Sequence, residues 1–594
     1  MWSTVCVYCL GNFALVNAKI FCKKRLPLRG RLCVTARRFA LFGLINMTMK
    51  HCIIFNANQE VKRRTSGAYR FANQMESMGW RVTVVDWACD WPEDQLLHYL
   101  DAIVGDNTLL FAFSYTWMTP WWTRGAISKL RKRYPGRKYL AGGQQHYQDS
   151  VGFDVMMYGY SELALPETIT WMFDGGKSPK HRIHMDGVLI DCIIDYPAMS
   201  LPTYGINYRD DDFLLPHEML TIEVSRGCKF KCKFCNFPFL GVREETHTNF
   251  EQLRAELIDN YERWGTTNYL LADETLNDRE SKLDMMGDVV QSLPFEVNFS
   301  GFVRLDLTVA RPQQIAKLAR ARVWGQYYGI ETFNQDAGKT IGKSMSGDRI
   351  KQGLLDMRDY FMSELGLYRG TVSMIAGLRY ETPDDWKESE QWLKDNWNGQ
   401  NWQWYPLDIS LNTDTSTSSD LTKNWATSGF RRIEDPARLA AYEEKYGMKA
   451  SHAGVQHKTE NIHVSNLKWE HDHATIEQAS AFCTRWQEEI HELNHQKLGS
   501  FSILHYVPMF ENNIQGLLDM SNTDPRHKNI WGFQGQWETI MKPYINSKMN
   551  SIQKLDTLLK TDVGPAFLEQ GRELFFKEVY NKREIKNTYF EVAV

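Results

Sequence analysis

The chain has 594 residues, of which 43% are hydrophobic, so it can bury several cores and we expect roughly two to four domains. Lys and Arg total 69 against 72 Asp and Glu, and this net charge of −3 argues against a general binder of nucleic acids or membrane surfaces. No apolar run reaches the ~18 residues that a membrane-spanning helix needs.

The first residues are basic and free of acids. Nine Lys or Arg precede Glu60, the first acidic residue. Such a bias is typical of organelle transit peptides, but this stretch makes a poor amphipathic helix. We therefore interpret residues 1–48 as a leader or an upstream extension of the reading frame, with the protein starting at Met47 or Met49. Widely scattered cysteines indicate a reducing compartment, the cytoplasm unless residues 1–48 are a transit peptide.

Residues 49–178 alternate between strand and helix patterns with short turns between them. Strands are predicted at residues 51–57, 81–86, 108–117, 138–143 and 154–160. Amphipathic or acid-led helical stretches separate them. This alternation predicts an α/β fold with a doubly wound parallel sheet, which binds ligands beyond the carboxyl ends of its strands.

A second alternating series follows a proline-containing stretch. Residues 179–217 carry several prolines and the polar run "YRDDDF", which is typical of an inter-domain linker. Residues 218–415 then repeat six strand–helix units, which predicts an open or closed barrel with its chemistry at the carboxyl ends of the strands. Residues 416–594 have a mostly helical pattern, and we expect them to form a C-terminal domain.

Three of the 11 cysteines are crowded into "SRGCKFKCKFC", directly after the first strand of the second series. Cys228, Cys232 and Cys235 have the spacing C-x3-C-x2-C, which lets one loop bring three thiolates to the corners of an iron–sulfur cube. A structural zinc site would require four ligands, and no cysteine pair lies nearby to complete one. Three protein ligands leave one metal position open, which indicates chemistry at the metal.

This stretch resembles the radical S-adenosylmethionine (SAM) superfamily. The resemblance implies a partial (β/α)6 radical SAM barrel whose three cysteines hold a 4Fe-4S cluster, with SAM chelating the fourth iron. It also implies that Phe234 packs near the adenine of SAM. Asp273 and Glu274 are the corresponding candidates to receive the SAM ammonium group, Arg304 to pair with its carboxylate and Glu331 to meet its ribose. Surface ion pairs or helix caps are the alternative roles for these residues.

Residues 49–178 resemble the cobalamin-binding, Rossmann-like domain that precedes the radical SAM core in one subgroup. Gly142 and Gly143 match a Gly-Gly of that subgroup, and Gly159 with Glu162 keeps half of its Gly-Glu-Gly-Glu turn. The resemblance implies that these glycines let the backbone approach cobalamin closely. The loop after the first strand contains no His to bind cobalt. The domain either binds cobalamin or is retained without it.

The resemblance implies an enzyme that cleaves SAM to a 5'-deoxyadenosyl radical, which then attacks a small-molecule or peptide substrate. If cobalamin is bound, methyl transfer to an unactivated carbon is the leading reaction; without it, oxidation, rearrangement or ring formation is expected. A reductase, flavodoxin or ferredoxin would donate electrons, and neither nucleic acid nor membrane is expected as a partner. The rival hypothesis, from another class, is a binding protein in which the cysteines form a structural metal site.

Overall fold

The computed structural model describes two stretches of α/β structure and the helices attached to them. The described residues are 49–58, 64–117, 120–143, 153–158, 162, 164–175, 182–184, 189–191, 206–215, 218–235, 248–397, 400–409, 419–446, 467–496 and 541–581. The expected leader and Gly159 lie outside them. The chain divides into two compact units, Met1–Met49 and Lys50–Val594, and the fold reported below belongs to the second unit.

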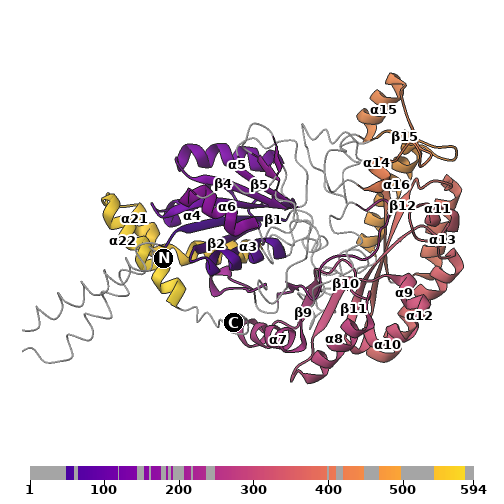
Figure 1. The fold of residues 1–594 in the computed structure, drawn as a ribbon, viewed down its shortest axis with the longest axis horizontal. Helices are drawn as coiled ribbons and strands as arrows, with labels where there is room; N and C mark the ends of the chain where they lie inside the picture. Colours follow the sequence, from indigo (N-terminus) through magenta and orange to yellow (C-terminus); the bar gives the residue numbers. More distant parts are fainter. Residues whose placement is uncertain are drawn as a thin grey trace, which may run out of the picture. The chain divides into compact units, whose positions relative to one another are not determined.

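The first sheet has five parallel strands in the order β2-β1-β3-β4-β5 (Figure 1). They are β1 (His51–Asn58), β2 (Arg81–Asp86), β3 (Thr108–Trp117), β4 (Lys138–Gly143) and β5 (Val155–Tyr158). Every residue of β2 is buried, as expected for a parallel strand that is covered on both faces. The predicted doubly wound sheet is confirmed.

Helices cover both faces of this sheet; three lie between successive strands, and the fourth follows β5. They are α3 (Ser66–Ser77), α4 (Glu93–Ile103), α5 (Pro120–Arg133) and α6 (Ala164–Asp174). Apolar residues of α3 and α6 share one core, whereas those of α4 and α5 share another. The strand order reverses between β1 and β3, and ligands of such sheets bind beyond the carboxyl ends of the strands at this point.

The second sheet has six parallel strands in sequential order, from β8 at one edge to β13 at the other. They are β8 (Leu220–Ile222), β9 (Asn268–Leu271), β10 (Asn298–Phe302), β11 (Val323–Glu331), β12 (Arg369–Ala376) and β13 (Asn401–Pro406). Six parallel strands joined in sequence by helices confirm the predicted βα units. The carboxyl end of each strand lies on the same edge of the sheet.

Seven helices connect these strands: α7 (Phe250–Trp264), α8 (Glu280–Ser292), α9 (Leu305–Ala310), α10 (Gln313–Arg320), α11 (Gln335–Thr340), α12 (Gly347–Leu365) and α13 (Pro383–Asn396). Local sequence signals set several of their ends. Asn249 forms a capping box with Gln252 at the start of α7, and Gly265 ends that helix with a φ of +68°. Thr382 caps α13 in the same way, ahead of a proline at the first helical position.

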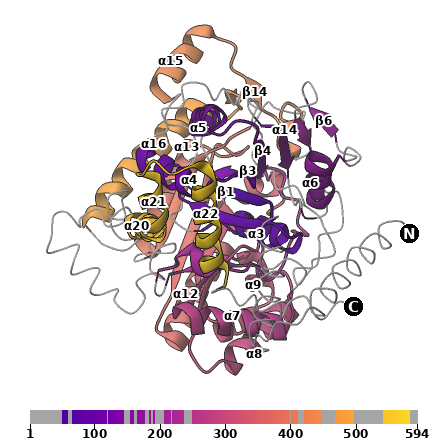
Figure 2. The same ribbon diagram turned by 90° about the vertical axis from the view of Figure 1, so that its left-hand side faces the viewer.

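The stretch expected to form one helical C-terminal domain instead supplies helices to two cores. One group contains α14 (Asp420–Lys423), α15 (Pro436–Tyr446) and α16 (Ile476–Gln496), together with the antiparallel pair β14 (Arg431–Arg432) and β15 (Trp469–Glu470). Within it, Phe482 of α16 packs on Trp404 of β13 at 5.0 Å between ring centres. The second group, α20 (Lys542–Ser551), α21 (Gln553–Leu559) and α22 (Pro565–Asn581), packs on the first sheet (Figure 2).

Side-chain contacts join this second group to the first sheet. The backbone N–H of Asp86 donates to the Tyr544 hydroxyl at 2.8 Å. Both terminal nitrogens of Arg81 contact the Glu573 carboxylate, at 3.3 and 3.2 Å. Residues more than 450 positions apart in the chain therefore share one core, a relation that no sequence pattern indicates.

The predicted linker contains regular structure, and part of it is buried. It includes the hairpin of β6 (Arg182–His184) and β7 (Leu189–Asp191) and the 3-10 turn η2 (Asp210–Asp212). Tyr208 and Asp212 are fully buried. The Tyr208 hydroxyl donates to the carbonyl of Thr221 at 3.0 Å and accepts from its N–H at 3.1 Å. Because β8 is an edge strand, this residue covers backbone groups that the sheet leaves unpaired.

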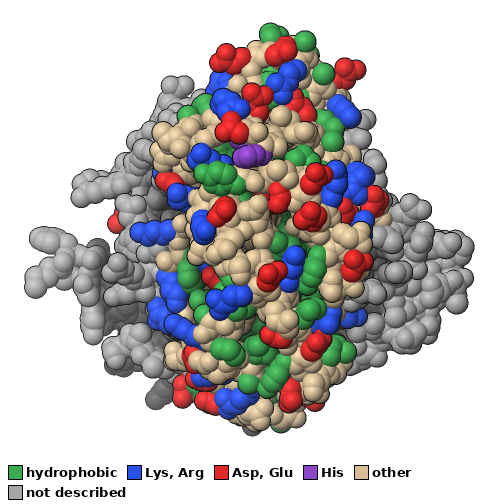
Figure 3. Space-filling model, turned by 90° about the vertical axis from the view of Figure 1, so that its right-hand side faces the viewer, with side chains coloured by type: hydrophobic (Ala, Val, Ile, Leu, Met, Phe, Trp, Pro, Cys, Tyr) green, Lys and Arg blue, Asp and Glu red, His purple; other side chains and the backbone are tan. Residues whose placement is uncertain are grey.

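Lys and Arg side chains are interspersed with Asp and Glu on the face shown in Figure 3, without a large area of one charge. Within the described part of the chain, no helix has the length and apolar character to cross a membrane.

Candidate functional site

The three cysteines lie in the loop that follows β8. Cys228 is buried, Cys232 and Cys235 are half-buried, and all three are thiols without a disulfide. Gly227, directly before Cys228, has a φ of +85°, a conformation that favours glycine and turns the chain sharply into the loop. The Cys235 N–H donates to the Cys232 carbonyl at 3.1 Å, which closes a turn between the second and third thiols.

Two side chains donate or share hydrogen bonds with these thiols. The Cys228 sulfur lies 3.4 Å from the Thr275 hydroxyl, and Arg304 Nη1 donates to the Cys232 sulfur at 3.5 Å. Burial raises the pKa of the Cys228 thiol, and the contact with Thr275 opposes that rise. Thr275 therefore offsets part of the effect of burial on Cys228, and the thiolate is the form of cysteine that binds metals.

Asp273, at the end of β9, fixes the entry to the cysteine loop. Its carboxylate is fully buried and accepts hydrogen bonds from the Val224 N–H at 2.9 Å and the Ser225 hydroxyl at 2.6 Å. Lys282 of α8 donates to the same hydroxyl at 2.7 Å. Burial raises the pKa of Asp273, and the charge of Lys282 opposes it. Both oxygens of the residue predicted to receive the SAM ammonium group thus hold the loop itself.

Glu274, the other residue predicted for the ammonium group, is half-buried in the turn after Asp273. Its backbone carbonyl accepts a hydrogen bond from the Thr275 hydroxyl at 2.8 Å. This turn thus places Glu274 next to a residue that contacts Cys228.

The far side of the cysteine loop rests on two later segments of the chain. The Lys233 N–H donates to the Ile341 carbonyl at 3.2 Å, and the Leu421 N–H donates to the Lys233 carbonyl at 2.8 Å. Gly342 has a φ of +85° and lies against the backbone of Lys231 and Cys232. The loop is therefore held by backbone contacts on one side and by the Asp273 carboxylate on the other.

Arg304 follows β10 and lies beside the cysteine loop. Beyond its contact with Cys232, it donates to Asp306 at 3.0 and 2.6 Å and lies over the Phe230 ring, 3.7 Å from its centre. Asn277 exchanges two hydrogen bonds with the Arg304 backbone, at 2.8 and 2.9 Å. Arg304 is thus fixed by the turn after β9 while its side chain keeps 15% of its area exposed.

Phe234 and Glu331 are brought together by Lys343, a residue that the sequence analysis missed. Lys343 Nζ lies 2.9 Å from a Glu331 oxygen and 5.6 Å from the centre of the Phe234 ring. Glu331 ends β11 next to a register shift and has a φ of +70°. Backbone strain at a residue other than glycine clusters at binding and catalytic sites. Lys343 lies in the loop after α11, where no motif singles it out.

The glycines of the first sheet are only partly described. Gly142 and Gly143 end β4 and pair with Met157 and Tyr158 of β5. A Cβ atom added at Gly142 would meet only the Met157 carbonyl, at 3.9 Å, which is an ordinary contact. The packing of the described residues thus gives no internal reason for glycine at this position. Gly159 lies outside the described residues.

The donor set of the loop fits an iron–sulfur cluster better than a single metal ion. Among the described residues, no three His, Cys, Asp or Glu side chains are grouped so that they could hold one ion. A single ion needs its ligands around one point, whereas a cube with iron at separate corners holds its thiolates farther apart. Three thiols from one loop, with hydrogen-bond donors beside two of them, suit that second kind of site.

A cavity of about 720 Å³ lies away from the cysteine loop, between the first sheet's helices and α21–α22. Its basic groups have internal partners. Arg133 contacts Asp101, and Arg137 donates to the carbonyls of Pro135 and Gly105 at 2.8 and 3.0 Å. The cavity is lined by residues of α4, α5, α21, α22 and the loops beside them, and none of them lies at a strand end of the second sheet.

Comparisons with known proteins agree with this geometry. Residues 222–393 match the family model described as the radical SAM superfamily. No curated protein matches the chain. Similar solved structures include the cobalamin-dependent SAM radical enzyme OxsB with aqua-cobalamin bound, at 13% identity and a TM-score of 0.50, covering 91% of this chain and 85% of that one.

Another similar structure is the radical SAM methyltransferase TsrM from Kitasatospora setae with cobalamin and a 4Fe-4S cluster bound. It has 12% identity and a TM-score of 0.49, covering 90% of this chain and 99% of that one. At this identity, the likeness to OxsB shows that the two chains share a fold, a parallel N-terminal sheet followed by a radical SAM core. Residues 222–393, from the end of β8 into α13, are therefore the part of the chain that matches the radical SAM superfamily.

Proposed function

We propose that Cys228, Cys232 and Cys235 hold a 4Fe-4S cluster and that the enzyme cleaves SAM. One observation carries the proposal: the three thiols follow the edge strand of the radical SAM domain, and Arg304 from another strand end donates to one of them. When bound, such a cluster supplies the electron that breaks the sulfonium bond of SAM, which gives methionine and a 5'-deoxyadenosyl radical.

The side chains around the loop suit the parts of SAM. Arg304 offers a planar guanidinium for the carboxylate, in exchange for its contact with Asp306. Glu331 has acceptor oxygens for the ribose hydroxyls, and Phe234 has a ring face for adenine. We assign the ammonium group to Glu274 rather than to Asp273, because both oxygens of Asp273 already accept hydrogen bonds from the loop.

Electron paramagnetic resonance tests the SAM site directly. The full chain is reconstituted anaerobically with iron and sulfide, reduced with dithionite and titrated with SAM. We expect about four irons per chain and a change in the signal of the reduced cluster as SAM binds. A paramagnetic resonance signal of the reduced cluster that does not change at saturating SAM would contradict the proposal.

We further propose that the first sheet binds cobalamin and that the reaction is a methyl transfer to a small-molecule or peptide substrate. The packing at Gly142 supports this proposal, since a Cβ atom there would meet only an ordinary protein contact, whereas a bulky ligand that approaches the backbone closely would require glycine. OxsB, whose fold is similar, binds aqua-cobalamin. A radical SAM reaction without cobalamin is the alternative.

A titration with hydroxocobalamin decides between these two reactions. The wild type should bind the corrin, whereas Gly142→Leu should bind it much more weakly and keep its iron content. The Cβ atom of the new side chain meets only an ordinary contact, and an unchanged iron content and urea unfolding curve would show that loss of binding does not reflect misfolding. Absence of binding by the wild type would overturn methyl transfer and favour cobalamin-independent chemistry.

A binding protein with a structural metal site is the rival function. Such a site needs no polar side chains at successive strand ends, yet Asp273, Arg304 and Glu331 occupy three of them. For the electron donor we propose a reductase, flavodoxin or ferredoxin. The six cysteines within the described residues are thiols, as expected in a reducing compartment such as the cytoplasm.

A further inference from the structure

Four charged side chains form a closed ring between the first sheet and the cysteine loop. Arg226, two residues before Cys228, contacts Glu162 at 2.6 Å and Glu223 at 2.7 Å. Arg70 of α3 contacts the same two carboxylates: it pairs closely with Glu223 and lies 3.6 Å from Glu162. Each arginine thus bridges both glutamates, and the two positive charges balance the two negative ones.

The ring is almost closed to water. None of its four side chains is more than 9% exposed. Burial alone would raise the pKa of Glu162, but the charges of Arg226 and Arg70 outweigh it and hold that pKa below its usual value. Glu256 of α7 feels the charges of Arg70 and Glu223; burial raises its pKa to about 8, so it is mostly protonated at neutral pH.

The four residues of the ring come from three segments of the chain. Glu162 lies in the turn after β5, the half-kept Gly-Glu-Gly-Glu turn of the first domain. Gln74 of α3 donates to its backbone carbonyl, so α3 holds this turn by both side chain and backbone. Glu223 and Arg226 occupy the stretch between β8 and the first cysteine. The ring therefore connects the proposed cobalamin domain with the cysteine loop through buried charges.

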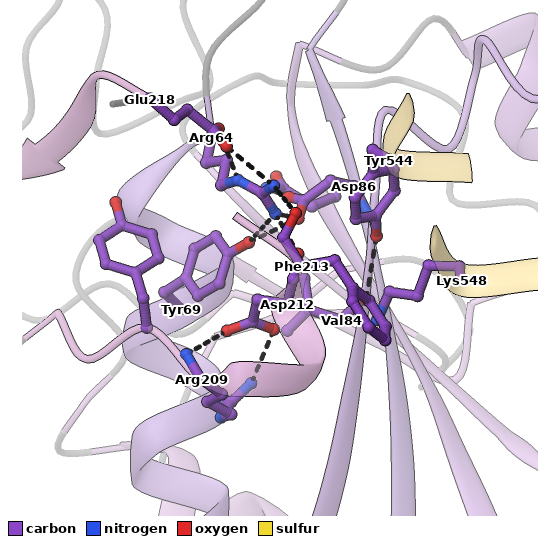
Figure 4. A network of polar contacts seen from close by, with 12 residues as sticks. Arg64, Tyr69, Val84, Asp86, Arg209, Asp212, Phe213, Glu218, Tyr544 and Lys548 are labelled. Atoms are coloured by element: carbon purple, nitrogen blue, oxygen red, sulfur yellow. Dashed lines mark hydrogen bonds and ion pairs between the residues drawn. The ribbon is translucent and has the colours of Figure 1, made fainter. Parts of the chain in front are cut away.

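A second buried pair holds the other end of β8 to the same helix. Arg64, just before α3, donates to both oxygens of Glu218 at 2.7 and 3.2 Å (Figure 4). Its remaining donors reach Asp86, Tyr69 and the carbonyls of Asp212 and Phe213. Glu218 precedes β8 and Glu223 follows it. Arg64 before α3 and Arg70 within it therefore form ion pairs at both ends of this edge strand.

We infer that Glu162 and Arg70 are positioning residues for the cysteine loop. Arg226 is joined to Cys228 through Gly227 alone, and its guanidinium takes its direction from Glu162 and Glu223. A displacement of the turn after β5 must therefore move Arg226 and, with it, the first cysteine. This inference deepens the proposed function: ligand binding beside that turn and the state of the cysteine loop become coupled, and such coupling is reciprocal.

The test compares three variants of the full chain. Glu162→Gln keeps the size of the side chain and removes its charge from the ring. Arg70→Lys keeps the charge but replaces a planar fork by one ammonium group, which cannot hold both carboxylates in the same geometry. The matched control is Glu573→Gln, which removes a carboxylate from a buried arginine elsewhere in the first domain, 3.2 Å from Arg81.

Hydrogen–deuterium exchange of residues 223–235, measured before any cluster is assembled, is the first readout. We expect Glu162→Gln to speed exchange there about tenfold and Arg70→Lys to do so by less, while the control leaves it unchanged. The midpoint potential of the reconstituted cluster is the second readout, and it should shift in the two ring variants only.

Equal exchange in Glu162→Gln and in the control would overturn the inference, as would an unshifted potential in both ring variants. If Glu162→Gln fails to fold, Arg70→Lys decides alone by the same two criteria. The exchange measurement needs neither cluster nor SAM. A wild type that fails to cleave SAM would therefore contradict the proposed function, but it would not change the conclusion drawn from the exchange rates of residues 223–235.

Discussion

The two parallel sheets use polar side chains at their strand ends in opposite ways. At the first sheet, Asp86 ends β2 fully buried and accepts from Asn56 at 2.6 Å, from Arg64 and from the Tyr69 hydroxyl at 2.5 Å. At the second sheet, the side chain of Arg304, which follows β10, is 15% exposed, and that of Lys343, which pairs with Glu331 at the end of β11, is 18% exposed. Each has a carboxylate partner beside the cysteine loop.

The comparison teaches that a polar residue at a strand end does not by itself indicate a ligand site. A fully buried charge is stable only while its internal partners remain, so turning it toward a ligand would leave them unpaired. A partly exposed charge can exchange its partner for a ligand at lower cost, because water already reaches it. Asp86 therefore belongs to the architecture, whereas Arg304 and Lys343 are available for binding.

Replacing all three cysteines by Ala should have the largest effect. Without thiolates the loop offers no ligand for iron, so the reconstituted protein should lose its iron and its visible absorption completely. Iron analysis measures this directly. The matched control is Cys89→Ala, which removes a half-buried thiol near the end of β2 and should leave about four irons in place. A triple variant that keeps its iron would refute the assignment.

Asp86→Ala should remove the buried polar contacts at the end of β2 and lower the free energy of unfolding. It leaves Arg64, Tyr69 and Asn56 without their shared acceptor, and removing one partner of a buried ion pair costs about 3–5 kcal/mol of unfolding free energy. Urea unfolding measures the loss. Glu93→Ala, which removes the exposed partner of Lys129, should cost under about 1 kcal/mol. A similar small cost for Asp86→Ala would remove the contrast between the two sheets.

Glu381 adds to the comparison because it is a fully buried polar residue that follows a strand of the second sheet. It follows β12, is fully buried, and accepts from the Thr332 hydroxyl at 2.5 Å and the Trp386 ring N–H at 3.0 Å. Burial raises its pKa to about 8 from the usual 4.5. The folded protein therefore holds a proton that the unfolded chain releases, so the stability from Glu381 declines as the pH rises between these two values.

Glu381→Gln mimics the protonated side chain and tests this pH dependence. Between about pH 5.5 and 7.5, the wild type should lose about 2 kcal/mol more unfolding free energy than the variant. Urea unfolding at several pH values measures the difference. Parallel pH profiles for the two proteins would show that Glu381 is ionised in the folded state.

Arg304→Gln should have the smallest effect on the fold and a selective effect on SAM. Removing one charge-assisted contact to the SAM carboxylate should lower kcat/KM for SAM about tenfold, or about 1.4 kcal/mol, mainly through KM. Its unfolding free energy should change by under about 1 kcal/mol, since the side chain is partly exposed. The exposed Arg311→Gln is the matched control and should keep the wild-type kcat/KM. An equal KM for SAM in the two variants would show that Arg304 does not bind SAM.

Local sequence patterns predicted the strands and the cysteine loop, because apolar runs and C-x3-C-x2-C spacing are local signals. The contact of Arg304 with that loop was also within reach, since parallel strands present their carboxyl ends on one edge. Three features were not predicted: the contact of Lys343 with Glu331, the ion pair of Glu162 with Arg226, and the docking of α20 on the first sheet. The contacts of Glu162 and of α20 join residues far apart in the chain, and burial and charge pairing decide them only after both sheets have formed. Lys343 lies only 12 positions after Glu331, but its loop carries no motif.

Anaerobic SAM cleavage tests the central claim most directly. The reconstituted full chain is mixed with SAM and a strong reductant, and 5'-deoxyadenosine is quantified beside the variant that lacks Cys228, Cys232 and Cys235. The account predicts several turnovers of 5'-deoxyadenosine from the wild type and none from the variant. A wild type that holds its cluster and binds SAM, yet forms no 5'-deoxyadenosine with any of several electron donors, would contradict it.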